Sequence, residues 1–357
     1  MAVFAARDFD AHEQVVFVHD AATGLRAIVA VHNTTLGPGV GGVRFWPYAD
    51  DDAALADALR LSRGMTYKSA LAGLPFGGGK SVIFGDPRRD KSPALMAAFG
   101  RAVDRLGGRY VAAEDVGTNV ADMDAIATAT RHVAGTSATS GDPSPWTAYG
   151  VYEAIRAAIR FARGRADGDV AGLTVAVQGL GAVGTAVARL LHEAGAKLIV
   201  ADVRAEAVDR AVAAFGATPA DPATIHAVAA DVFSPCALGA VLNDETIPVL
   251  GARIVAGSAN NQLAEDRHGA MLARRGVLYA PDYVVNAGGI IAVAYGAGFM
   301  GARGGDDIRR HVAGIHATLL EIFARARADQ LPTAAVADRM AEARFRPEPA
   351  NAEGAAA

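Results

Sequence analysis

The stretch Leu173-Thr-Val-Ala-Val-Gln-Gly-Leu-Gly-Ala-Val-Gly184 decides the fold. Its first five residues are mostly apolar and β-branched and predict a buried strand, and the apolar run through Leu191 predicts a helix. The Gly-x-Gly-x-x-Gly between them is typical of the turn that joins strand to helix in a Rossmann dinucleotide-binding domain. This segment therefore predicts a parallel α/β sheet that binds a dinucleotide.

The glycines of this turn have separate predicted tasks. Gly179 makes the tight turn, Gly181 lets the backbone approach a pyrophosphate, and Gly184 lets helix and strand pack closely. The helix N-terminus then faces the phosphate charge. The predicted cofactor-binding segment consists of Gly179, Leu180, Gly181, Ala182, Val183 and Gly184. The alternative is a glycine-rich turn that binds nothing.

A carboxylate at the end of the next predicted strand, Lys197–Ala201, indicates which dinucleotide binds. Asp202 stands 18 residues after Gly184, where a carboxylate accepts hydrogen bonds from the adenosine ribose hydroxyls and repels a 2′-phosphate. Asp202 therefore favours NAD. Arg204 is the opposing signal, because an arginine there can bind the 2′-phosphate of NADP.

The chain before this segment also alternates strands and helices. Two β-rich runs between residues 14 and 31 surround Asp20-Ala-Ala-Thr-Gly24, which predicts a hairpin. Helices are predicted over residues 51–65 and 94–106, and strands over 80–84 and 110–113. The predicted fold class is α/β, with an N-terminal α/β substrate domain, a Rossmann domain and a cleft between them.

Length and local composition predict the domain boundaries, because 357 residues suit two domains. The Ser-, Thr-, Gly- and Pro-rich segment 136–145 predicts a hinge. We expect residues 1–135 to form the substrate-binding and catalytic domain and 146–330 to form the NAD-binding domain. The helical segment 331–347 is expected to pack back on the first domain, and the aperiodic residues 348–357 are expected to be disordered.

Composition and charge limit the partners. The formal net charge is −4 and no block of Lys and Arg lies on an apolar or aromatic-interleaved face, so we expect no nucleic-acid partner. Residues 283–302 carry no charge and are long enough to cross a bilayer. They contain five glycines, which weaken a helix interior, so we expect a buried strand-turn-helix there and no membrane partner.

A single cysteine, Cys236, excludes an intramolecular disulfide framework. Without a Cys/His cluster at ligand spacing, no metal site is expected. The first ten residues reach Arg7 and Asp8 before any apolar stretch, which does not resemble a secretion signal. These features favour a cytoplasmic location.

Two lysines mark a second functional segment. Lys68 and Lys80 are the only charges between Gly64 and Gly85, so we expect both in a largely apolar interior or cleft. Burial and a neighbouring cation lower the pKa of a lysine, which prepares one of the two as a general base while the other holds a carboxylate. The alternative is a pair of lysines at element ends whose ammonium groups reach water.

Further motifs are spread over both predicted domains. They read TTLGPGVGGVRFW (residues 34–46), GMTYKSALAGLPFGGGKSV (64–82), AEDVGTNVADMD (113–124), DPSPWTAYGVY (142–152), AVQGLGAVG (176–184), SPCALGAVLND (234–244), GSANNQL (257–263) and YAPDYVVNAGG (279–289). Together they resemble the glutamate/leucine/phenylalanine/valine dehydrogenase family, and the similarity runs from about residue 12 to 345. The chain most resembles the leucine-specific members of that family.

This resemblance implies the reaction and its central residues. The reaction is reversible oxidative deamination of an L-amino acid to a 2-oxo acid and ammonia, with hydride transfer to the nicotinamide. By resemblance, Lys80 is the base that activates the attacking water, Lys68 pairs with the substrate carboxylate, and Asp115 relays protons to and from the amino group. The alternative for Asp115 is a helix N-cap, since residues 118–129 have a helical pattern.

The resemblance also implies supporting contacts. Gly41 offers backbone to the substrate carboxylate, Thr147 meets the nicotinamide amide, and Asn260 contacts nicotinamide and substrate. Apart from the resemblance, an Asn-Asn pair or a Thr after Pro is an ordinary loop feature. We also expect a homo-oligomer.

Val40 and Val293 are the residues that the resemblance places around the substrate side chain. Glutamate-specific members have a lysine and a serine there, and a buried carboxylate without such a partner costs several kcal/mol. Leucine, valine and isoleucine are therefore the favoured substrates, with phenylalanine as the alternative. Two other classes are a hydroxy-acid dehydrogenase, which normally uses a histidine base, and an NAD-binding regulator without activity.

Overall fold

The computed structural model describes residues 3–139, 142–301 and 304–346, and they form two compact units. Of the described residues, 3–139, 293–301 and 341–346 belong to the first unit, and 142–292 and 304–340 belong to the second. The predicted tail, 348–357, lies outside the described residues. Each unit is described here by itself.

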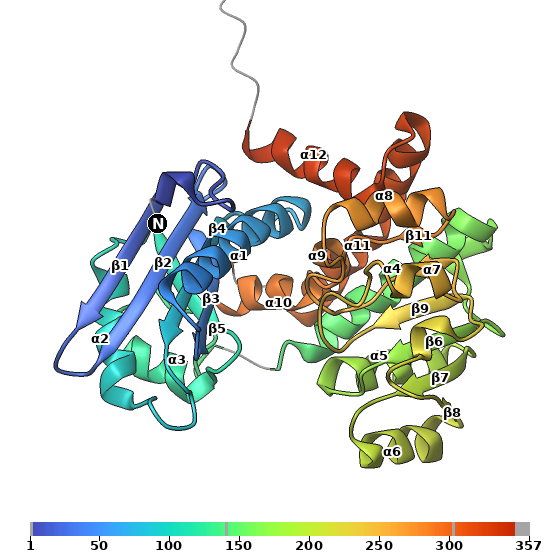
Figure 1. Ribbon diagram of the computed structural model, residues 1–357, viewed down its shortest axis with the longest axis horizontal. Helices are drawn as coiled ribbons and strands as arrows, with labels where there is room; N and C mark the ends of the chain where they lie inside the picture. The colour runs from blue at the N-terminus through green and yellow to red at the C-terminus, as the bar shows by residue number, and fades with distance from the viewer. Residues whose placement is uncertain (1–2, 140–141, 302–303, 347–357) are drawn as a thin grey trace, which may run out of the picture. The chain divides into compact units, whose positions relative to one another are not determined.

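The first unit is built on a five-stranded mixed sheet in the order β1-β2-β4-β3-β5 (Figure 1). Its strands are β1 (Gln14–Asp20), β2 (Leu25–Asn33), β3 (Gly39–Trp46), β4 (Gly77–Phe84) and β5 (Tyr110–Glu114). The pairs β1/β2 and β2/β4 are antiparallel, whereas β3 pairs in parallel with both β4 and β5. The predicted hairpin is confirmed as β1 and β2.

Helices cover both faces of this sheet (Figure 1). On one face, α1 (Asp51–Leu71) packs Leu55 and Leu59 against β2 and β4. On the other face lie α2 (Pro93–Asp104) and α3 (Val120–Ala127). The side chains of Asp50, Ser92 and Asn119 accept hydrogen bonds from backbone N–H groups in the first turns of α1, α2 and α3, which satisfies donors left free by helix geometry. A single 3₁₀ turn, η1 (Val3–Ala5), precedes the sheet.

The second unit is built on a six-stranded sheet in the order β11-β10-β9-β6-β7-β8, and all its strand pairs are parallel. Its strands are β6 (Thr174–Gln178), β7 (Lys197–Ala201), β8 (Thr218–Pro219), β9 (Val232–Pro235), β10 (Ile254–Val255) and β11 (Leu278–Tyr279). The sheet order reverses beside β6, with β7 on one side and β9 on the other. Such a switch point is where open α/β sheets bind ligands.

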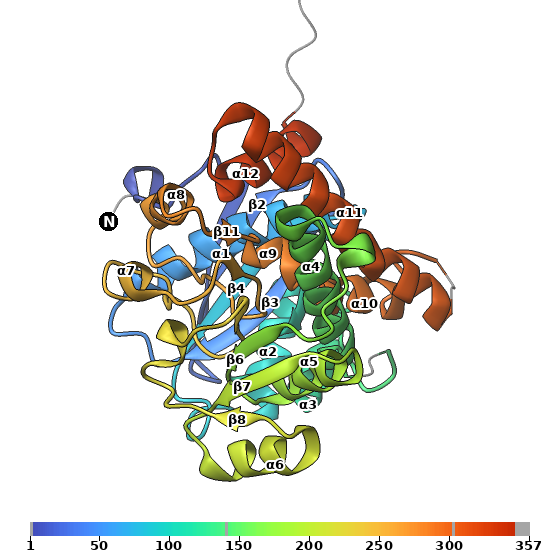
Figure 2. The same ribbon diagram turned by 90° about the vertical axis from the view of Figure 1, so that its right-hand side faces the viewer.

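The described helices that lie wholly in the second unit are α4 (Ser144–Arg163), α5 (Ala182–Glu193), α6 (Ala205–Phe215), α7 (Thr246–Val249), α8 (Arg267–Arg274), α9 (Asp282–Val285) and α11 (Gly305–Asp329), whereas α10 (Gly288–Gly296) and α12 (Thr333–Phe345) are divided between the two units. Two 3₁₀ turns, η2 (Ala166–Gly168) and η3 (Ile225–Ala227), complete the second unit. Figure 2 shows α4 beside α5 and α11, against which it packs. Apolar residues of α7 and α8, such as Ile247 and Leu272, share a core with Phe233 of β9.

The structure confirms the α/β fold with a Rossmann-type parallel sheet and corrects one predicted element. Residues 283–302 contain no strand among the described positions: α9 ends at Val285 and α10 occupies Gly288–Gly296. A short buried apolar run fits a strand and a buried helix equally well, which is why the pattern misled. No described helix has the length and apolarity needed to cross a membrane.

Segment boundaries also differ from those expected. Residues 293–301 cluster with the first unit rather than the second, and α12 contributes residues to both units, with the change at Ala341. Within the predicted hinge 136–145, the last two residues already belong to α4. The two units are defined by contacts between residues in the folded chain. A change of composition along the sequence does not reveal which distant segments make those contacts.

Candidate active site

Lys80 and Asp115 form an ion pair in the first unit. Lys80 Nζ lies 2.7 Å from Asp115 Oδ2, and the side chains are 7% and 21% exposed. Lys80 lies within β4 and Asp115 directly follows β5. The two strands lie on either side of β3, so the sheet brings together two residues 35 positions apart in the sequence.

A glycine on the strand between them makes this approach possible. A Cβ added at Gly42 would lie 2.6 Å from Asp115 Cβ and 3.1 Å from Lys80 Nζ. Real Cβ atoms do not approach another carbon so closely, so any larger residue would push the pair apart. Gly42 is therefore part of the site although the sequence did not mark it individually; its signal is the Gly-Gly pair within GVGGVRFW.

Burial and neighbouring charges shift both groups. Burial lowers the pKa of Lys80, Asp115 raises it, Arg44 lowers it, and the net pKa is below the usual lysine value. Burial alone would raise the pKa of Asp115, but Lys80 and Arg44 beside it hold that pKa below its usual value. The pair thus combines a stable carboxylate with an amine that loses its proton more readily than an ordinary lysine.

Arg44 and Asp57 extend the pair into a four-residue charge cluster, consisting of Lys80, Asp115, Arg44 and Asp57. Arg44 Nε donates to Asp115 Oδ2 at 2.9 Å, and Arg44 Nη1 donates to Asp57 Oδ2 at 2.8 Å. Tyr48 Oη donates to the same Asp57 oxygen at 2.6 Å. Sequence reasoning missed these residues, because Asp57 looks like an ordinary helix acid and Arg44 is 71 residues from Asp115.

Asp115 is not the cap of the helix that follows it. The N-cap of α3 is Asn119, whose side chain accepts a hydrogen bond from Asp122 N, while Asp122 reaches back to Asn119 N. This capping box satisfies the first turn without Asp115. The alternative considered from the sequence is therefore wrong, and the Asp115 carboxylate serves the charge cluster.

Lys68 lies half-buried in the last turn of α1. The helix packs tightly against β4 at this point, because a Cβ added at Gly78 would overlap Thr66 N and Ser62 O. This glycine contact holds the last turns of α1 directly over the strand that carries Lys80. Lys68 and Lys80 thus belong to adjacent elements of one unit.

The predicted substrate contacts Val40, Gly41 and Val293 also belong to the first unit. Val40 and Gly41 lie on β3, where Val40 has no exposed surface and the Gly41 carbonyl accepts a hydrogen bond from Tyr110 Oη at 2.8 Å. Val293 is half-buried on α10. Gly41 also allows a close approach of β4, because a Cβ there would overlap the Gly79 carbonyl.

The predicted dinucleotide turn has the geometry that its glycines imply. Gly179 has φ +95°, a left-handed value that favours glycine, and a Cβ added at Gly184 would overlap the Gly179 carbonyl. Gly181 is the N-cap of α5, with no side chain bonded to the free N–H groups and no atom within 4 Å of an added Cβ. Ala182 and Val183 form the first turn of α5. An open, uncapped helix N-terminus of this kind suits a pyrophosphate.

Asp202 directly follows β7, beside this turn. Its Oδ2 accepts a hydrogen bond from Leu180 N at 2.7 Å and its Oδ1 lies 3.1 Å from Arg204 Nε. Partial burial alone would raise the pKa of Asp202, but Arg204 and the N–H groups of Leu180 and Arg204 lower it to about 2. The carboxylate is therefore anionic and held at the end of β7, beside the Gly179–Gly184 turn.

Thr147 and Asn260 belong to the second unit as well. Thr147 lies in the first turn of α4 and donates to the Pro143 carbonyl at 3.2 Å. Asn260 is exposed, and its Oδ1 accepts a hydrogen bond from Asn286 Nδ2 at 2.7 Å. Asn286 is 6% exposed, and its own Oδ1 has no hydrogen-bond partner among the residues that the structure describes. Sequence reasoning missed Asn286, whose signal is its place in the YAPDYVVNAGG motif.

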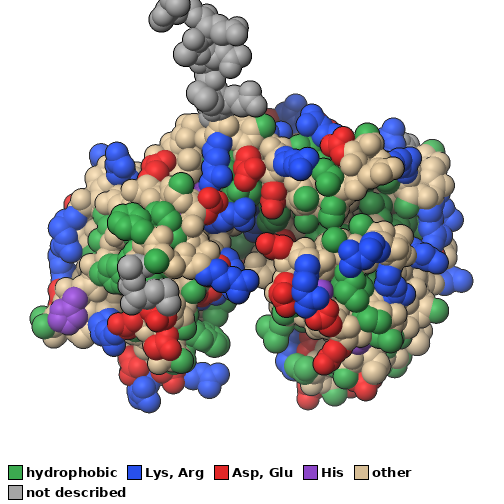
Figure 3. Space-filling model, turned by 45° about the horizontal axis from the view of Figure 1, so that its top comes forward, with side chains coloured by type: hydrophobic (Ala, Val, Ile, Leu, Met, Phe, Trp, Pro, Cys, Tyr) green, Lys and Arg blue, Asp and Glu red, His purple; other side chains and the backbone are tan. Residues whose placement is uncertain are grey.

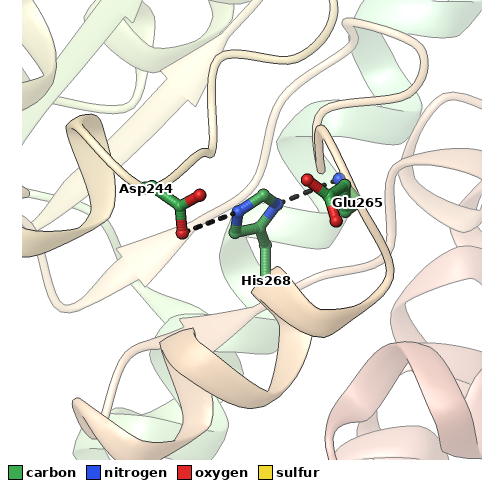
Figure 4. A group of neighbouring side chains, drawn as sticks. All are labelled: Asp244, Glu265 and His268. Atoms are coloured by element: carbon green, nitrogen blue, oxygen red, sulfur yellow. Dashed lines mark hydrogen bonds and ion pairs between the residues drawn. The ribbon is translucent and has the colours of Figure 1, made fainter.

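One group of possible metal ligands occurs among the described residues: Asp244, Glu265 and His268 (Figure 4). His268 Nδ1 accepts a hydrogen bond from Glu265 N at 2.9 Å, so Nε2 carries the proton and faces Asp244 at 3.4 Å. Arg267 donates to both carboxylates. Neither nitrogen of His268 has a lone pair left for a metal, so this group is an ion-pair cluster.

Comparison with known proteins agrees with these features. Residues 12–132 match the family model described as Glu/Leu/Phe/Val dehydrogenase, dimerisation domain, and residues 140–208 and 201–296 match the model described as Glutamate/Leucine/Phenylalanine/Valine dehydrogenase. The chain is 52% identical over 340 residues to a leucine dehydrogenase of Geobacillus stearothermophilus, covering 94% of this chain and 90% of that one.

Two further relatives extend this comparison. A valine dehydrogenase of Streptomyces albus is 49% identical over 348 residues, covering 95% of this chain and 93% of that one. The crystal structure of L-tryptophan dehydrogenase from Nostoc punctiforme matches with a TM-score of 0.83 and 43% identity, covering 94% of this chain and 96% of that one. As the sequence motifs predict, the chain belongs to the Glu/Leu/Phe/Val dehydrogenase family of amino acid dehydrogenases.

Proposed function

We propose that this amino acid dehydrogenase catalyses the reversible, NAD-dependent oxidative deamination of leucine, valine and isoleucine to their 2-oxo acids and ammonia. The observation that carries the proposal is the buried contact of 2.7 Å between Lys80 and Asp115. A buried amine with a lowered pKa beside an ionised carboxylate provides a base and a proton acceptor within one small site. Similarity to leucine and valine dehydrogenases supports the choice of aliphatic substrates.

In this proposal the charged residues of the first unit divide the work. Lys68 pairs with the substrate carboxylate, with backbone of Gly41 beside it. Asp115 takes a proton from the substrate ammonium, which leaves the amine lone pair that expels hydride from Cα. Lys80, as the neutral amine, then removes a proton from the water that attacks the imino carbon, and Asp115 returns a proton to the nitrogen of the resulting carbinolamine. The C–N bond breaks to release ammonia, and the hydroxyl proton passes to the Asp115 carboxylate as the 2-oxo acid forms.

In the second unit the proposal assigns the dinucleotide to α5 and Asp202. The uncapped N–H groups at the N-terminus of α5 hold the pyrophosphate, Asp202 accepts the ribose hydroxyls, and Thr147 and Asn260 orient the nicotinamide. The bound NAD supplies the hydride acceptor. Asn286 supports Asn260 through its amide hydrogen bond.

The reaction is tested by NADH absorbance with purified enzyme, NAD and single L-amino acids. The proposal predicts NADH formation with leucine, valine and isoleucine, slower formation with phenylalanine and tryptophan, and none with L-lactate or L-malate. Faster turnover of an aromatic amino acid or of glutamate would contradict the branched-chain assignment. Turnover of the hydroxy acids alone would contradict the whole proposal.

Asp202→Ser tests the cofactor assignment. Removing the carboxylate takes away the ribose partner and the repulsion of a 2′-phosphate, and it releases Arg204 from its ion pair. We expect the Kd of NADH to rise about tenfold, the effect of about 1.4 kcal/mol, and the Kd of NADPH to fall. Fluorescence titration of the two reduced cofactors measures both constants without turnover.

A double variant, Asp202→Ser with Arg204→Gln, is the matched control for this experiment. It should lose the gain in NADPH affinity while keeping the weakened NADH binding, because the guanidinium is then missing. Tighter binding of NADPH than NADH by the wild-type enzyme would contradict the ribose role of Asp202.

Val40→Ala tests the side-chain pocket, with Val43→Ala as its control. Both valines lie on β3 and neither has exposed surface, so both substitutions remove the same two methyl groups from a packed site. If Val40 borders the substrate side chain, Val40→Ala lowers the ratio of kcat/KM for leucine over phenylalanine by about tenfold, because a methylene is worth about 1–3 kcal/mol of discrimination. Val43→Ala should leave the ratio unchanged. Equal ratios in the two variants would show that Val40 does not border the substrate side chain.

We also infer that the chain forms a homo-oligomer, because the model matched by residues 12–132 is described as a dimerisation domain. Light scattering of the purified chain tests the homo-oligomer, because the measured mass should be a multiple of the 36.6 kDa of one chain.

A lone half-buried cysteine, Cys236, fits a reducing cytoplasm. On the face presented in Figure 3, Lys and Arg side chains are interspersed with Asp and Glu, and the proposed partners are small molecules.

A further inference from the structure

Two cations share one oxygen of Asp115. Lys80 Nζ lies 2.7 Å and Arg44 Nε lies 2.9 Å from Asp115 Oδ2. The same guanidinium uses Nη1 to reach Asp57 Oδ2 at 2.8 Å. Because a guanidinium is planar and its donor directions are fixed, a bridge between two carboxylates restricts the orientation of both. Arg44 therefore fixes the carboxylate that Lys80 also contacts.

Asp57 holds the other end of this bridge. It lies on α1, its side chain is 13% exposed, and its Oδ2 also accepts the hydrogen bond from Tyr48 Oη. The exposed Arg60 is further away, at 3.7 Å from Asp57 Oδ1. The charge cluster contains two cations and two anions, and this balance compensates much of the cost of burying an ion pair. Asp57 is thus the anchor of Arg44 on the neighbouring helix.

The two ends of the bridge act on Lys80 with opposite sign. The positive charge of Arg44 lowers the pKa of Lys80, whereas the negative charges of Asp115 and Asp57 raise it. This difference in sign gives a measurable signature.

We propose that Arg44 is a positioning residue for the Lys80–Asp115 pair and that Asp57 is the anchor that holds Arg44 in place. Arg44 keeps the Asp115 carboxylate aligned with Lys80 and supplies the positive charge that opposes protonation of Lys80. The inference rests on the proposed roles of Lys80 and Asp115. It assigns no contact with substrate to Arg44.

The test compares the variants Arg44→Gln, Arg44→Lys and Asp57→Asn with the wild type, with leucine and NAD both saturating. For Arg44→Gln we expect kcat to fall about 10²-fold, the effect of misplacing a catalytic group by about 1 Å, and the rise of kcat with pH to move to higher pH. Arg44→Lys keeps the charge but cannot bridge two carboxylates, so kcat falls while the pH of the rise stays near that of the wild type. Asp57→Asn keeps a side-chain oxygen that can accept the hydrogen bond from Arg44 but removes the negative charge, so the rise should move to lower pH.

Three controls make the outcome specific. Arg26→Gln removes an exposed ion pair with Asp51 on the same unit and should change neither kcat nor its pH dependence. Far-UV circular dichroism and the midpoint of thermal unfolding show whether each variant is folded, and titration with NADH should give an unchanged Kd because the residues assigned to the dinucleotide belong to the second unit. The free substrate amine titrates identically whichever variant is assayed, so differences between the pH profiles report the enzyme or its complex with substrate.

Opposite shifts for Arg44→Gln and Asp57→Asn support the inference. Identical pH profiles for these two variants, or wild-type kcat in Arg44→Gln, overturn it. If Arg44→Gln does not fold, the other two variants decide. A lowered kcat in Arg44→Lys together with a rise at lower pH in Asp57→Asn supports the inference, and wild-type kcat in Arg44→Lys overturns it. Failure of the proposed function would look different, since the wild-type enzyme would then form no NADH with leucine.

Discussion

Lys80→Met is expected to lower kcat for leucine oxidation by about 10²–10⁴-fold, the usual contribution of a general base. Methionine fills a similar volume without an amine, so the packing of β4 is disturbed little. The expected Kd of NADH is unchanged, because the residues assigned to the dinucleotide belong to the second unit. Steady-state rates and fluorescence titration with NADH measure the two quantities. More than about a tenth of the wild-type kcat would contradict the role of Lys80.

The first unit contains a matched control for this variant. Lys91 Nζ lies 2.7 Å from Asp122 Oδ2, with side chains that are 19% and 12% exposed, so it forms a partly buried Lys–Asp pair of the same length outside the charge cluster. Lys91→Met should lose stability and keep kcat. A similar loss of kcat in both variants would mean that any buried lysine of this unit is needed only for folding.

Much of the fold was predictable because its signals are local. The strand, turn and helix around Gly179 follow from residues that are neighbours in the sequence, as does the hairpin of β1 and β2. Strand β3 was not predicted as an element, since Gly39, Gly41 and Gly42 weaken the strand pattern of GVGGVRFW. The structure explains these glycines by close approach: a Cβ at Gly41 or Gly42 would meet β4 or the Lys80–Asp115 pair.

The site was predictable only in part, for a related reason. Lys80 stands out because no other charge except Lys68 occurs between Gly64 and Gly85. Arg44 and Asp57 give no such signal, because each has an ordinary local explanation and their link to Asp115 depends on the register of β3 and β5 and on the packing of α1. Asn286 is similar, since its contact with Asn260 spans 26 residues. Contacts between distant segments need the folded chain.

Asp115→Asn is the second substitution with a large expected effect. Asparagine keeps the size of the side chain and can still accept one hydrogen bond, but it cannot take up a proton from the substrate ammonium. We expect kcat for leucine oxidation to fall by about 10²–10⁴-fold, as for loss of a general acid or base. Asp122→Asn, which changes the carboxylate of the matched Lys91 pair, should lower stability through the capping box of α3 and leave kcat close to that of the wild type.

The residual activity of Asp115→Asn carries a second test, because the substitution changes the charge beside Lys80. Asp115 raises the pKa of Lys80, so its neutralisation leaves burial and Arg44 to lower that pKa further. If neutral Lys80 is the base, the remaining rate must therefore rise with pH at a lower pH than in the wild type, although its plateau is much lower. A loss of proton relay alone would reduce the plateau without moving the rise, and a shift to higher pH would contradict the assignment of Lys80 as the base. The same pair of atoms, Lys80 Nζ and Asp115 Oδ2, thus predicts both the size of the loss and the direction of the pH shift.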